Sequence, residues 1–229
     1  MENTLTNLFV SAKDVFQQEG PISLLRRGFT FAAGLLSRYI FRYENYFLVE
    51  YPINTMMRGK HEADYMPRIQ SVTARIVTTL QQVDQLAADG FDFLDYWTDI
   101  RRRLLEKGAI ACCIFVGQEL ANMGWVAMTQ EAKDELDPVP YHVDFSNREV
   151  CLGGSLTMPR YRGHGLSPYN AYKRIQLLKE LGIMTARAQH KTTNMSIIKA
   201  VAKFDSKIYA KARYLRILGW RYYKEMPLR

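Results

Sequence analysis

The sequence predicts an α/β (α+β) protein in which strands and helices alternate behind an N-terminal helical extension. Apolar residues recur at helical spacing in the first 43 residues, whereas later β-branched and aromatic runs alternate with helical patterns, and glycine or proline separates the segments. A chain of 229 residues fits one domain of ordinary to large size with an appendage. We therefore divide it into an extension, residues 1–44, and a domain, residues 45–229.

Two helices are expected in the extension. Residues 3–18 have the apolar spacing of an amphipathic helix, and Gly20-Pro21 ends it. A second helix is expected from about Ile22 to Tyr43, with an uncharged part at 28–37 that is shorter than the roughly 20 apolar residues that span a bilayer. Residues 20–43 are rich in Arg and free of acids, so this helix either docks on its own protein or lies on a membrane surface.

The first half of the domain predicts strands, two short helices and a hairpin. β-branched residues favour strands at 46–53 and 72–79, followed by a helix at 80–88. Asp92, with Asp95 three residues on, is a plausible start for the next helix. Apolar runs at 109–116 and 123–129, joined by a Gly117-Gln118-Glu119 turn, predict an antiparallel hairpin.

The second half predicts a loop and then a regular alternation. A polar loop with Pro138 and Pro140 leads to a strand that begins near Glu149 and ends at Pro159. Pro168 suits the first turn of the helix that follows, because the missing N–H costs nothing there. The expected elements after this strand are a helix at 166–181, a strand at 183–188, a helix at 194–204, and strands at 207–218 and 220–224.

Positive charge is concentrated in the last third of the chain. The net charge is +8, but residues 158–229 hold 16 Lys and Arg against three Asp and Glu, so they carry +13 and the preceding 157 residues carry −5. We expect the anion-binding surface in this third, with a cofactor, a nucleic acid or a membrane as the polyanion.

The cysteines give no disulfide framework, since Cys112, Cys113 and Cys151 all lie inside apolar runs. We expect a reducing cytoplasmic setting, with peripheral contact at the inner membrane face through residues 20–43 as an option. His, Cys, Asp and Glu nowhere have metal-ligand spacing, so no metal is expected.

The stretch from Glu149 to Leu166, EVCLGGSLTMPRYRGHGL, combines an expected buried strand, a glycine turn and the start of a long helix. Gly163 and Gly165 permit positive φ and close backbone approach, so successive N–H groups and the positive end of the helix dipole can converge on a phosphate. Arg160 and Arg162 add charge to the same turn. The alternative is an ordinary strand-to-helix connection.

This order of elements resembles the GNAT superfamily of acyl-CoA-dependent N-acyltransferases. The resemblance covers about Tyr46 to the C-terminus and is most specific at MPRYRGHGL, residues 158–166, where an RxxGxG turn precedes a helix, a strand and an Asn-led helix at Asn194. It implies a mixed, mostly antiparallel central sheet flanked by helices. It also implies an N-acetyltransferase that moves an acyl group from acetyl-CoA, or another acyl-CoA, to a primary amine of a small molecule, amino sugar or amino acid.

The resemblance further implies which residues hold the cofactor. Amides of the glycine turn would cradle the pyrophosphate of coenzyme A, and the strands near 150–157 and 183–188 would part to expose an edge to the pantetheine arm. A backbone N–H near the end of the first strand would polarise the thioester carbonyl. The implied cofactor-binding residues are Leu156, Thr157, Met158, Arg160, Arg162, Gly163, His164, Gly165, Leu166 and Asn194.

Acyl transfer to an amine needs a base, and an acid can protonate the leaving thiolate. Glu149 is the expected base, because the histone-acetylating branch of the family carries its catalytic Glu at this place; the alternative is a solvated residue paired with Arg148. Many relatives have a Tyr seven residues into the Asn-led helix, where this chain has Val201. Tyr209 on the following strand is therefore the candidate general acid, with packing as the alternative.

Two further features of this region have two readings each. Gly153-Gly154 in the central strand predicts either room for the acceptor or acyl group, or a simple β-bulge. His190 follows a strand near the expected cofactor and is either a contact to phosphate or substrate or a residue without a functional role. His164, inside the glycine turn, is expected to face solvent.

Two other functions stay open. A non-catalytic acyl-CoA-binding module would keep the glycine turn and lack the acid. A basic binder of nucleic acid or of a membrane surface would use Lys and Arg of residues 207–224 among aromatic side chains. The preferred partner is a small-molecule amine rather than nucleic acid, and a homodimer is left open.

Overall fold

The computed structural model describes residues 41–56, 58–93, 96–194, 206–218 and 220–228. The chain divides into two compact units, residues 1–44 with 213–222 and residues 45–212 with 223–229. The strands, in chain order, are β1 (Phe41–Pro52), β2 (Val72–Val77), β3 (Ala109–Val116), β4 (Glu119–Ala127), β5 (Glu149–Thr157), β6 (Thr185–Lys191), β7 (Lys207–Ile217) and β8 (Trp220–Pro227). The helices and 3-10 turns are α2 (Ile53–Met56), η1 (Glu62–Tyr65), α3 (Leu80–Ala88), α4 (Asp99–Glu106), α5 (Gln130–Leu136), η3 (Phe145–Asn147), η4 (Pro159–Tyr161) and α6 (Leu166–Glu180).

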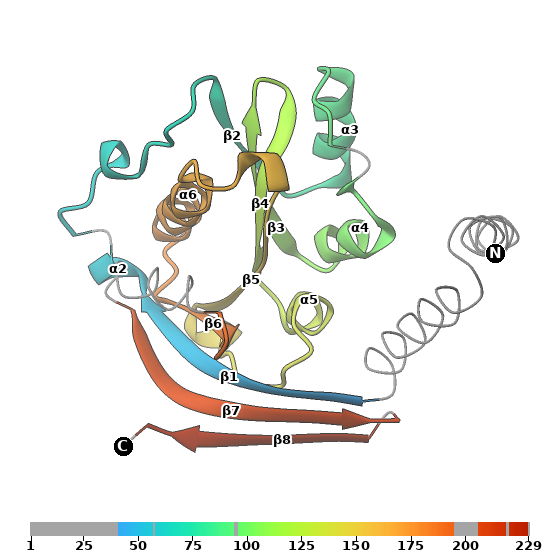
Figure 1. Ribbon diagram of the computed structural model, residues 1–229, viewed down its shortest axis with the longest axis vertical. Helices are drawn as coiled ribbons and strands as arrows, with labels where there is room; N and C mark the ends of the chain where they lie inside the picture. Colours follow the sequence, from blue (N-terminus) through green and yellow to red (C-terminus); the bar gives the residue numbers. More distant parts are fainter. Residues whose placement is uncertain (1–40, 57, 94–95, 195–205, 219, 229) are drawn as a thin grey trace, which may run out of the picture. The chain divides into compact units, whose positions relative to one another are not determined.

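The described strands form one mixed sheet in the order β2-β3-β4-β5-β6-β1-β7-β8 (Figure 1). Antiparallel ladders join β2 to β3, β3 to β4, and β4 to β5, and another joins β6 to β1. β5 and β6 pair in parallel. The mixed, mostly antiparallel sheet flanked by helices that the family resemblance implied is confirmed.

Helices cover both faces of the β2–β5 part of the sheet. α6 packs on β3 and β4 from one face, while α4 and α5 pack on the opposite face (Figure 1). β4 is buried from Leu120 to Ala127, as its unbroken run of uncharged residues requires of a strand covered on both faces. Leu166 and Tyr169 of α6 join a core cluster with Cys112 of β3. The start of α6 is thereby fixed against the sheet.

The first residues of β1 correct one prediction. Residues 41–44 are strand, so the expectation that the second N-terminal helix reaches Tyr43 is wrong at this end. The aromatic residues Phe41 and Tyr43 favour a strand. The helical spacing of the preceding residues does not predict the residue at which the strand begins. Within the smaller unit, Arg42 Nε donates to Glu44 at 2.7 Å, and its guanidinium lies 5.8 Å from the Tyr214 ring centroid. The helices expected in residues 1–40 lie outside the described residues.

The helix expected near Asp92 begins seven residues later, at Asp99. Asp92 instead joins the sheet, because its N–H donates to the Gln118 carbonyl (2.8 Å) and its carbonyl accepts from the Leu120 N–H (3.1 Å). A capping pattern in the sequence cannot reveal such a long-range pairing.

A third correction concerns residues 130–136, which were expected in a polar loop and form α5. Thr129 caps this helix by accepting a hydrogen bond from the Ala132 N–H at 3.1 Å. α5 matters for function because its C-terminal end, Leu136 and Asp137, reaches the cavity described below. The helix expected at 194–204 lies, beyond Asn194, outside the described residues.

Candidate functional site

β5 and β6 part after a short stretch of pairing. Their parallel ladder joins only Glu149, Val150 and Cys151 of β5 to β6, although β5 continues to Thr157. On its other edge β5 stays paired with β4 as far as Thr157, and β6 stays paired with β1 as far as Lys191. The edge of β5 that faces β6 therefore leaves the ladder beyond Cys151. An open strand edge of this kind can take hydrogen bonds from an extended ligand.

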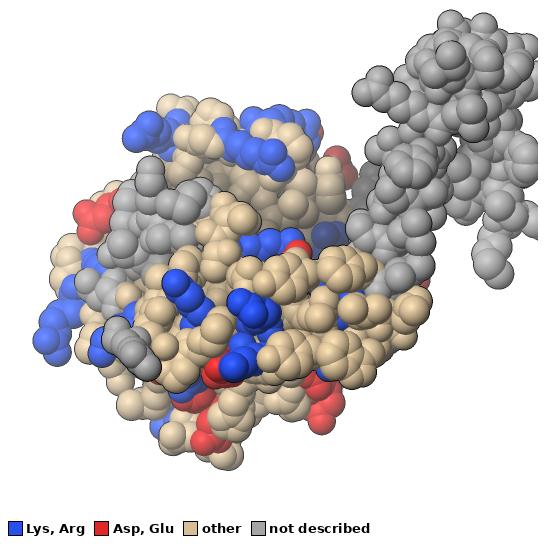
Figure 2. Space-filling model, turned by 60° about the horizontal axis from the view of Figure 1, so that its bottom comes forward, with Lys and Arg blue, Asp and Glu red and all other residues tan. Residues whose placement is uncertain are grey.

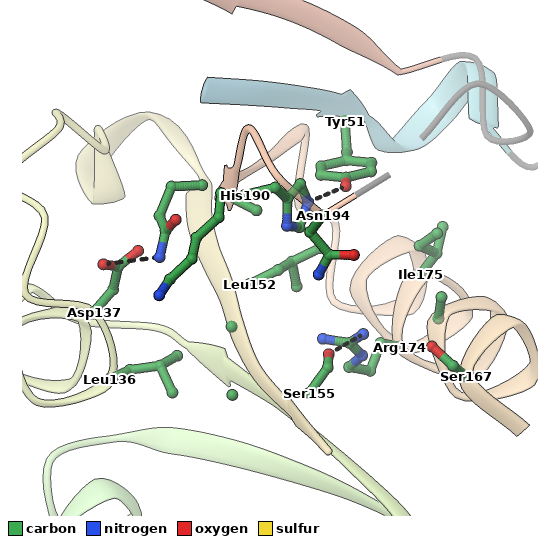
Figure 3. Close-up of a pocket in the computed structure, with 16 residues that line it drawn as sticks. Tyr51, Leu136, Asp137, Leu152, Ser155, Ser167, Arg174, Ile175, His190 and Asn194 are labelled. Atoms are coloured by element: carbon green, nitrogen blue, oxygen red, sulfur yellow. Dashed lines mark hydrogen bonds between the residues drawn. The ribbon is translucent and has the colours of Figure 1, made fainter. Parts of the chain in front are cut away.

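A cavity of about 330 Å³ lies at this parting (Figure 3). Its walls are residues 152–155 of β5, 188–191 of β6, Asn194, Tyr51, four residues of α6, and Leu136 with Asp137. α6 and α5 cover opposite faces of the sheet, so the cavity is lined from both faces.

The two glycines of β5 lie at a β-bulge and line the cavity as well. Met123 of β4 pairs with Leu156 and Trp125 pairs with Gly153, so one extra residue is inserted into β5. Gly154 has a φ of +57°, and a Cβ atom there would lie 2.7 Å from Trp125 Cδ1. Both readings of Gly153-Gly154 thus fit the structure, and packing against Trp125 already requires Gly154.

Arg174 of α6 places a buried guanidinium on the cavity wall. The residue is 7% exposed. Its Nη1 donates to the Trp125 carbonyl at 3.3 Å. Its Nη2 donates to Ser155 Oγ, also at 3.3 Å (Figure 3). Its Nε has no hydrogen-bond acceptor in the described part of the chain. Burial lowers the pKa of Arg174.

Tyr51 and His190 form a neutral pair on the same wall. The Tyr51 hydroxyl and His190 Nε2 are hydrogen-bonded at 2.9 Å (Figure 3). Burial, with a smaller contribution from the Arg174 charge, lowers the pKa of His190 to about 4. Burial raises the pKa of Tyr51. Both side chains are therefore uncharged near neutral pH and act by hydrogen bonding.

Asp137 supplies a buried carboxyl group on the α5 side of the cavity. It is 4% exposed, and its Oδ1 accepts from the Val139 N–H (3.0 Å) and from Gln189 Nε2 (3.5 Å). Burial raises its pKa, while the Val139 N–H and the nearby Lys133 charge act in the opposite direction. A buried carboxyl with a raised pKa in a cavity is a candidate general base.

The predicted glycine turn has two glycines at positive φ before α6. Gly163 and Gly165 have φ values of +84° and +82°, and Gly165 is the N-cap of α6. The N–H of Arg162 donates to the Pro159 carbonyl at 3.3 Å, whereas the N–H groups of Gly163, His164 and Gly165 have no backbone acceptor in the described part of the chain. These three amides, together with the α6 N-terminus, fit the phosphate role that the sequence predicted.

The remaining predicted cofactor residues divide between the cavity and its surroundings. Asn194 lines the cavity. Leu156, Thr157 and Met158 lie beyond the cavity-lining part of β5, and the Met158 N–H already donates to the Ala121 carbonyl at 2.9 Å. The Met158 amide is therefore engaged within the protein and cannot serve as the free donor expected from the sequence.

Glu149 and Tyr209, the predicted base and acid, both contact Arg187. Arg187 donates to both carboxylate oxygens of Glu149, at 2.6 and 2.7 Å, and its guanidinium lies 5.1 Å from the Tyr209 ring centroid. The hydrogen bonds from Arg187 lower the pKa of Glu149, which makes it a weaker base. Neither residue lines the cavity. Their catalytic roles stay predictions.

Three cavity residues were missed or left without a role by the sequence. Arg174 lies in a helical pattern where a charged residue usually marks the solvent face, and Asp137 lies in a Pro-rich loop. Tyr51 is one of 14 tyrosines and carries no local signal. The sequence signals for this site were Gly153-Gly154, His190 and Asn194.

The competing basic surface is less uniform than the net charge suggests. On the face in Figure 2, Lys and Arg side chains stand in separate groups among uncharged and acidic side chains. In the described part of the chain, no group of His, Cys, Asp and Glu is arranged to hold a metal ion. Within the same residues, no helix has the length and hydropathy to cross a bilayer.

Comparison with known proteins finds similarity in solved structures only. No family model and no curated protein sequence matches the chain. A tandem GNAT protein from the clavulanic acid biosynthesis pathway is 13% identical with a TM-score of 0.48, over 86% of this chain and 59% of that one. A GCN5-related N-acetyltransferase-like protein from Streptococcus suis is 11% identical with a TM-score of 0.47, over 86% and 68%. A GCN5-related N-acetyltransferase from Kribbella flavida is 14% identical with a TM-score of 0.46, over 82% and 64%.

The chain spans less than two thirds of several of the structures it matches. The shares are 57% for a Drosophila protein, 64% for a Staphylococcus epidermidis protein and 62% for a putative GNAT-family acetyltransferase from Novosphingobium aromaticivorans. These likenesses concern the arrangement of helices and strands.

Proposed function

We propose that the chain is an acyl-CoA-dependent N-acyltransferase that transfers an acyl group, acetyl in the simplest case, to a primary amine. One observation carries the proposal: a single stretch, 149–166, contains both an open strand edge beside a cavity and a glycine turn with free amides at a helix N-terminus. A phosphate-bearing thioester with an extended arm matches these two features together.

The turn and the strand would divide the work of binding. The amides of Gly163, His164 and Gly165, assisted by the α6 dipole and the Arg160 and Arg162 charges, would hold the pyrophosphate. The open edge of β5 would hydrogen-bond to the pantetheine arm. Because the Met158 N–H is engaged, we assign polarisation of the thioester carbonyl to a backbone N–H within 152–157, on the open edge of β5.

The chemistry requires one proton to leave the amine and one to reach the sulfur. The amine nitrogen attacks the thioester carbonyl carbon, so a C–N bond forms, the C–S bond breaks, and the thiolate leaves with the electron pair. Asp137 would accept the proton of the amine, directly or through a water molecule, because it lines the cavity and burial raises its pKa. Glu149 as base and Tyr209 as acid remain the alternative assignment.

The test is release of free thiol from acetyl-CoA across a panel of amines, with the product identified by mass spectrometry. Asp137→Asn should lower kcat by about 100-fold or more while leaving acetyl-CoA affinity unchanged. A matched control is Asp84→Asn on the exposed side of α3, which should retain full activity. Tight binding of acetyl-CoA with no product from any amine would instead identify a binding module.

A further inference from the structure

We infer that Arg174 anchors a carboxylate-binding subsite inside the cavity, so that one of the two substrates carries a carboxylate close to the reacting carbonyl. The inference deepens the proposed function. It rests on that function for the identity of the two substrates that enter the cavity. The carboxylate belongs either to the acyl group or to the acceptor amine, and the experiment below separates these sources.

The buried positive charge of Arg174 has no acidic partner in the described part of the chain. A buried cation is costly unless it is paired and hydrogen-bonded. Arg174 has five N–H donors, yet in the described part of the chain it uses two, on neutral oxygens at 3.3 Å, and no Asp or Glu there forms an ion pair with it. A carboxylate in the cavity would supply the missing negative charge.

The fold leaves space for the Arg174 guanidinium at Gly124. A Cβ atom on Gly124 of β4 would lie 2.8 Å from Arg174 Cζ and 2.9 Å from Asn170 Oδ1. Asn170 is itself fixed, because its Nδ2 donates to the Cys112 carbonyl at 2.8 Å. The guanidinium thus lies against Gly124 and is held by hydrogen bonds to the Trp125 carbonyl and Ser155 Oγ, as a specific binding group must be.

Among the residues that the structure describes, none of the titratable groups around Arg174 neutralises its charge. Burial keeps Tyr51 and Cys112, whose ionisation would act on Arg174, in their neutral forms, and His190 is also neutral. Asp137 lines the cavity from the opposite face of the sheet, where Lys133 offsets its charge. The positive charge of Arg174 therefore remains available to a ligand.

The position and shape of the Arg174 guanidinium favour a carboxylate over a phosphate as its ligand. Arg174 lies eight residues after Leu166, so it is about 12 Å along the helix axis from the glycine turn and separate from the phosphate cradle. One planar guanidinium matches a carboxylate in charge and in bidentate geometry. A phosphate dianion would call for further donors such as the three free amides of the turn.

The donor arm of the test compares succinyl-CoA with butyryl-CoA, which differ by a terminal carboxylate in place of a methyl group. Isothermal titration calorimetry on the full-length protein and on Arg174→Gln measures both affinities. If the carboxylate belongs to the acyl group, the wild type should prefer succinyl-CoA by about 10- to 100-fold, and Arg174→Gln should remove that preference.

The acceptor arm compares alanine with alaninamide, measured by ligand-detected NMR with the protein alone and with CoA present. If the carboxylate belongs to the acceptor, alanine should bind more tightly by a similar factor, again only when Arg174 is present. This comparison measures carboxylate binding at Arg174 even if no CoA thioester binds. A wrong assignment of the function can therefore be distinguished from the absence of a carboxylate subsite. Equal affinities in both arms, or a preference that survives in Arg174→Gln, would overturn the inference.

Control variants separate binding from folding. Lys179→Gln removes an exposed charge from the same helix and should leave both preferences intact. Arg174→Lys keeps the charge without the planar fork and should retain part of the preference. A purely structural role for Arg174 would weaken succinyl-CoA and butyryl-CoA equally, and that result would also overturn the inference.

Discussion

Gly124 and Arg174 occupy complementary space: the absence of a side chain on the β4 glycine leaves the volume in which the α6 guanidinium lies, 2.8 Å from where a Cβ atom would be. This contact fixes the guanidinium beside the β-bulge, where it donates to the Trp125 carbonyl. A residue that sequence patterns would place on a solvated helix face is thereby held in the cavity.

Gly124→Ala should lower the free energy of unfolding by about 1–3 kcal/mol, because the new methyl group has no free volume. Urea denaturation measures the change. In an Arg174→Ala background part of this cost should disappear, while the contact with Asn170 Oδ1 at 2.9 Å remains. An equal cost in both backgrounds would show that the methyl group does not meet Arg174.

His190 should make stability depend on pH. Its pKa is about 4 in the folded protein against an ordinary 6.5, so between these values the unfolded chain binds a proton that the folded protein does not. Stability should therefore be unaffected above pH 6.5 and should fall by up to about 3 kcal/mol as the pH drops to 4.

The measurement is urea denaturation of the wild type and of His190→Gln at several pH values. Glutamine can still hydrogen-bond to Tyr51 but does not titrate, so the stability difference between the two proteins should shift against the wild type as the pH falls. Parallel pH profiles would contradict a neutral, buried His190.

Much of the fold was predictable because its signals are local. The β3–β4 hairpin and α6 show clear patterns of apolar runs, turn residues and helix spacing, and the structure has both. The start of α4 was missed because long-range pairing places Asp92 in the sheet. α5 begins at a local cap, Thr129, but it is only seven residues long and lies in a polar stretch, so its pattern is weak. In the site, the glycine turn was readable from sequence, whereas Arg174 and Asp137 become cavity residues only through tertiary burial.

Glu149→Gln should destabilise the protein more than it affects catalysis. The variant loses charge-assisted hydrogen bonds from Arg187 in a largely buried pair, which should cost about 1–3 kcal/mol at pH 7. Because hydrogen bonding to Arg187 lowers the Glu149 pKa, this stabilisation is present above the ordinary value of 4.5 and is lost as the pH falls through the folded-state pKa.

Unfolding free energies and kcat should be measured together for Glu149→Gln, with Glu135→Gln as a matched control that loses bonds from Lys107 and Arg103 away from the cavity. A 100-fold fall in kcat with little change in stability would assign the base to Glu149 instead of Asp137.

Arg162→Gln should weaken binding of acetyl-CoA by about tenfold at low salt, with the difference shrinking as salt screens the charge. Binding of acetyl-pantetheine, which lacks the pyrophosphate, should not change. Arg160→Gln should have a smaller effect, because Arg160 already forms an ion pair with Glu119 at 2.6 Å. Equal losses for both ligands in Arg162→Gln would contradict a phosphate role for the turn.

The central claim is that an acyl-CoA lies along 149–166, with its pyrophosphate at the turn and its thioester in the cavity. Backbone amide NMR during titration with acetyl-CoA tests this most directly. We predict saturable chemical-shift changes at Gly163, His164 and Gly165 and at residues 152–155. Shift changes absent from both segments, or confined to β7 and β8, would contradict the account.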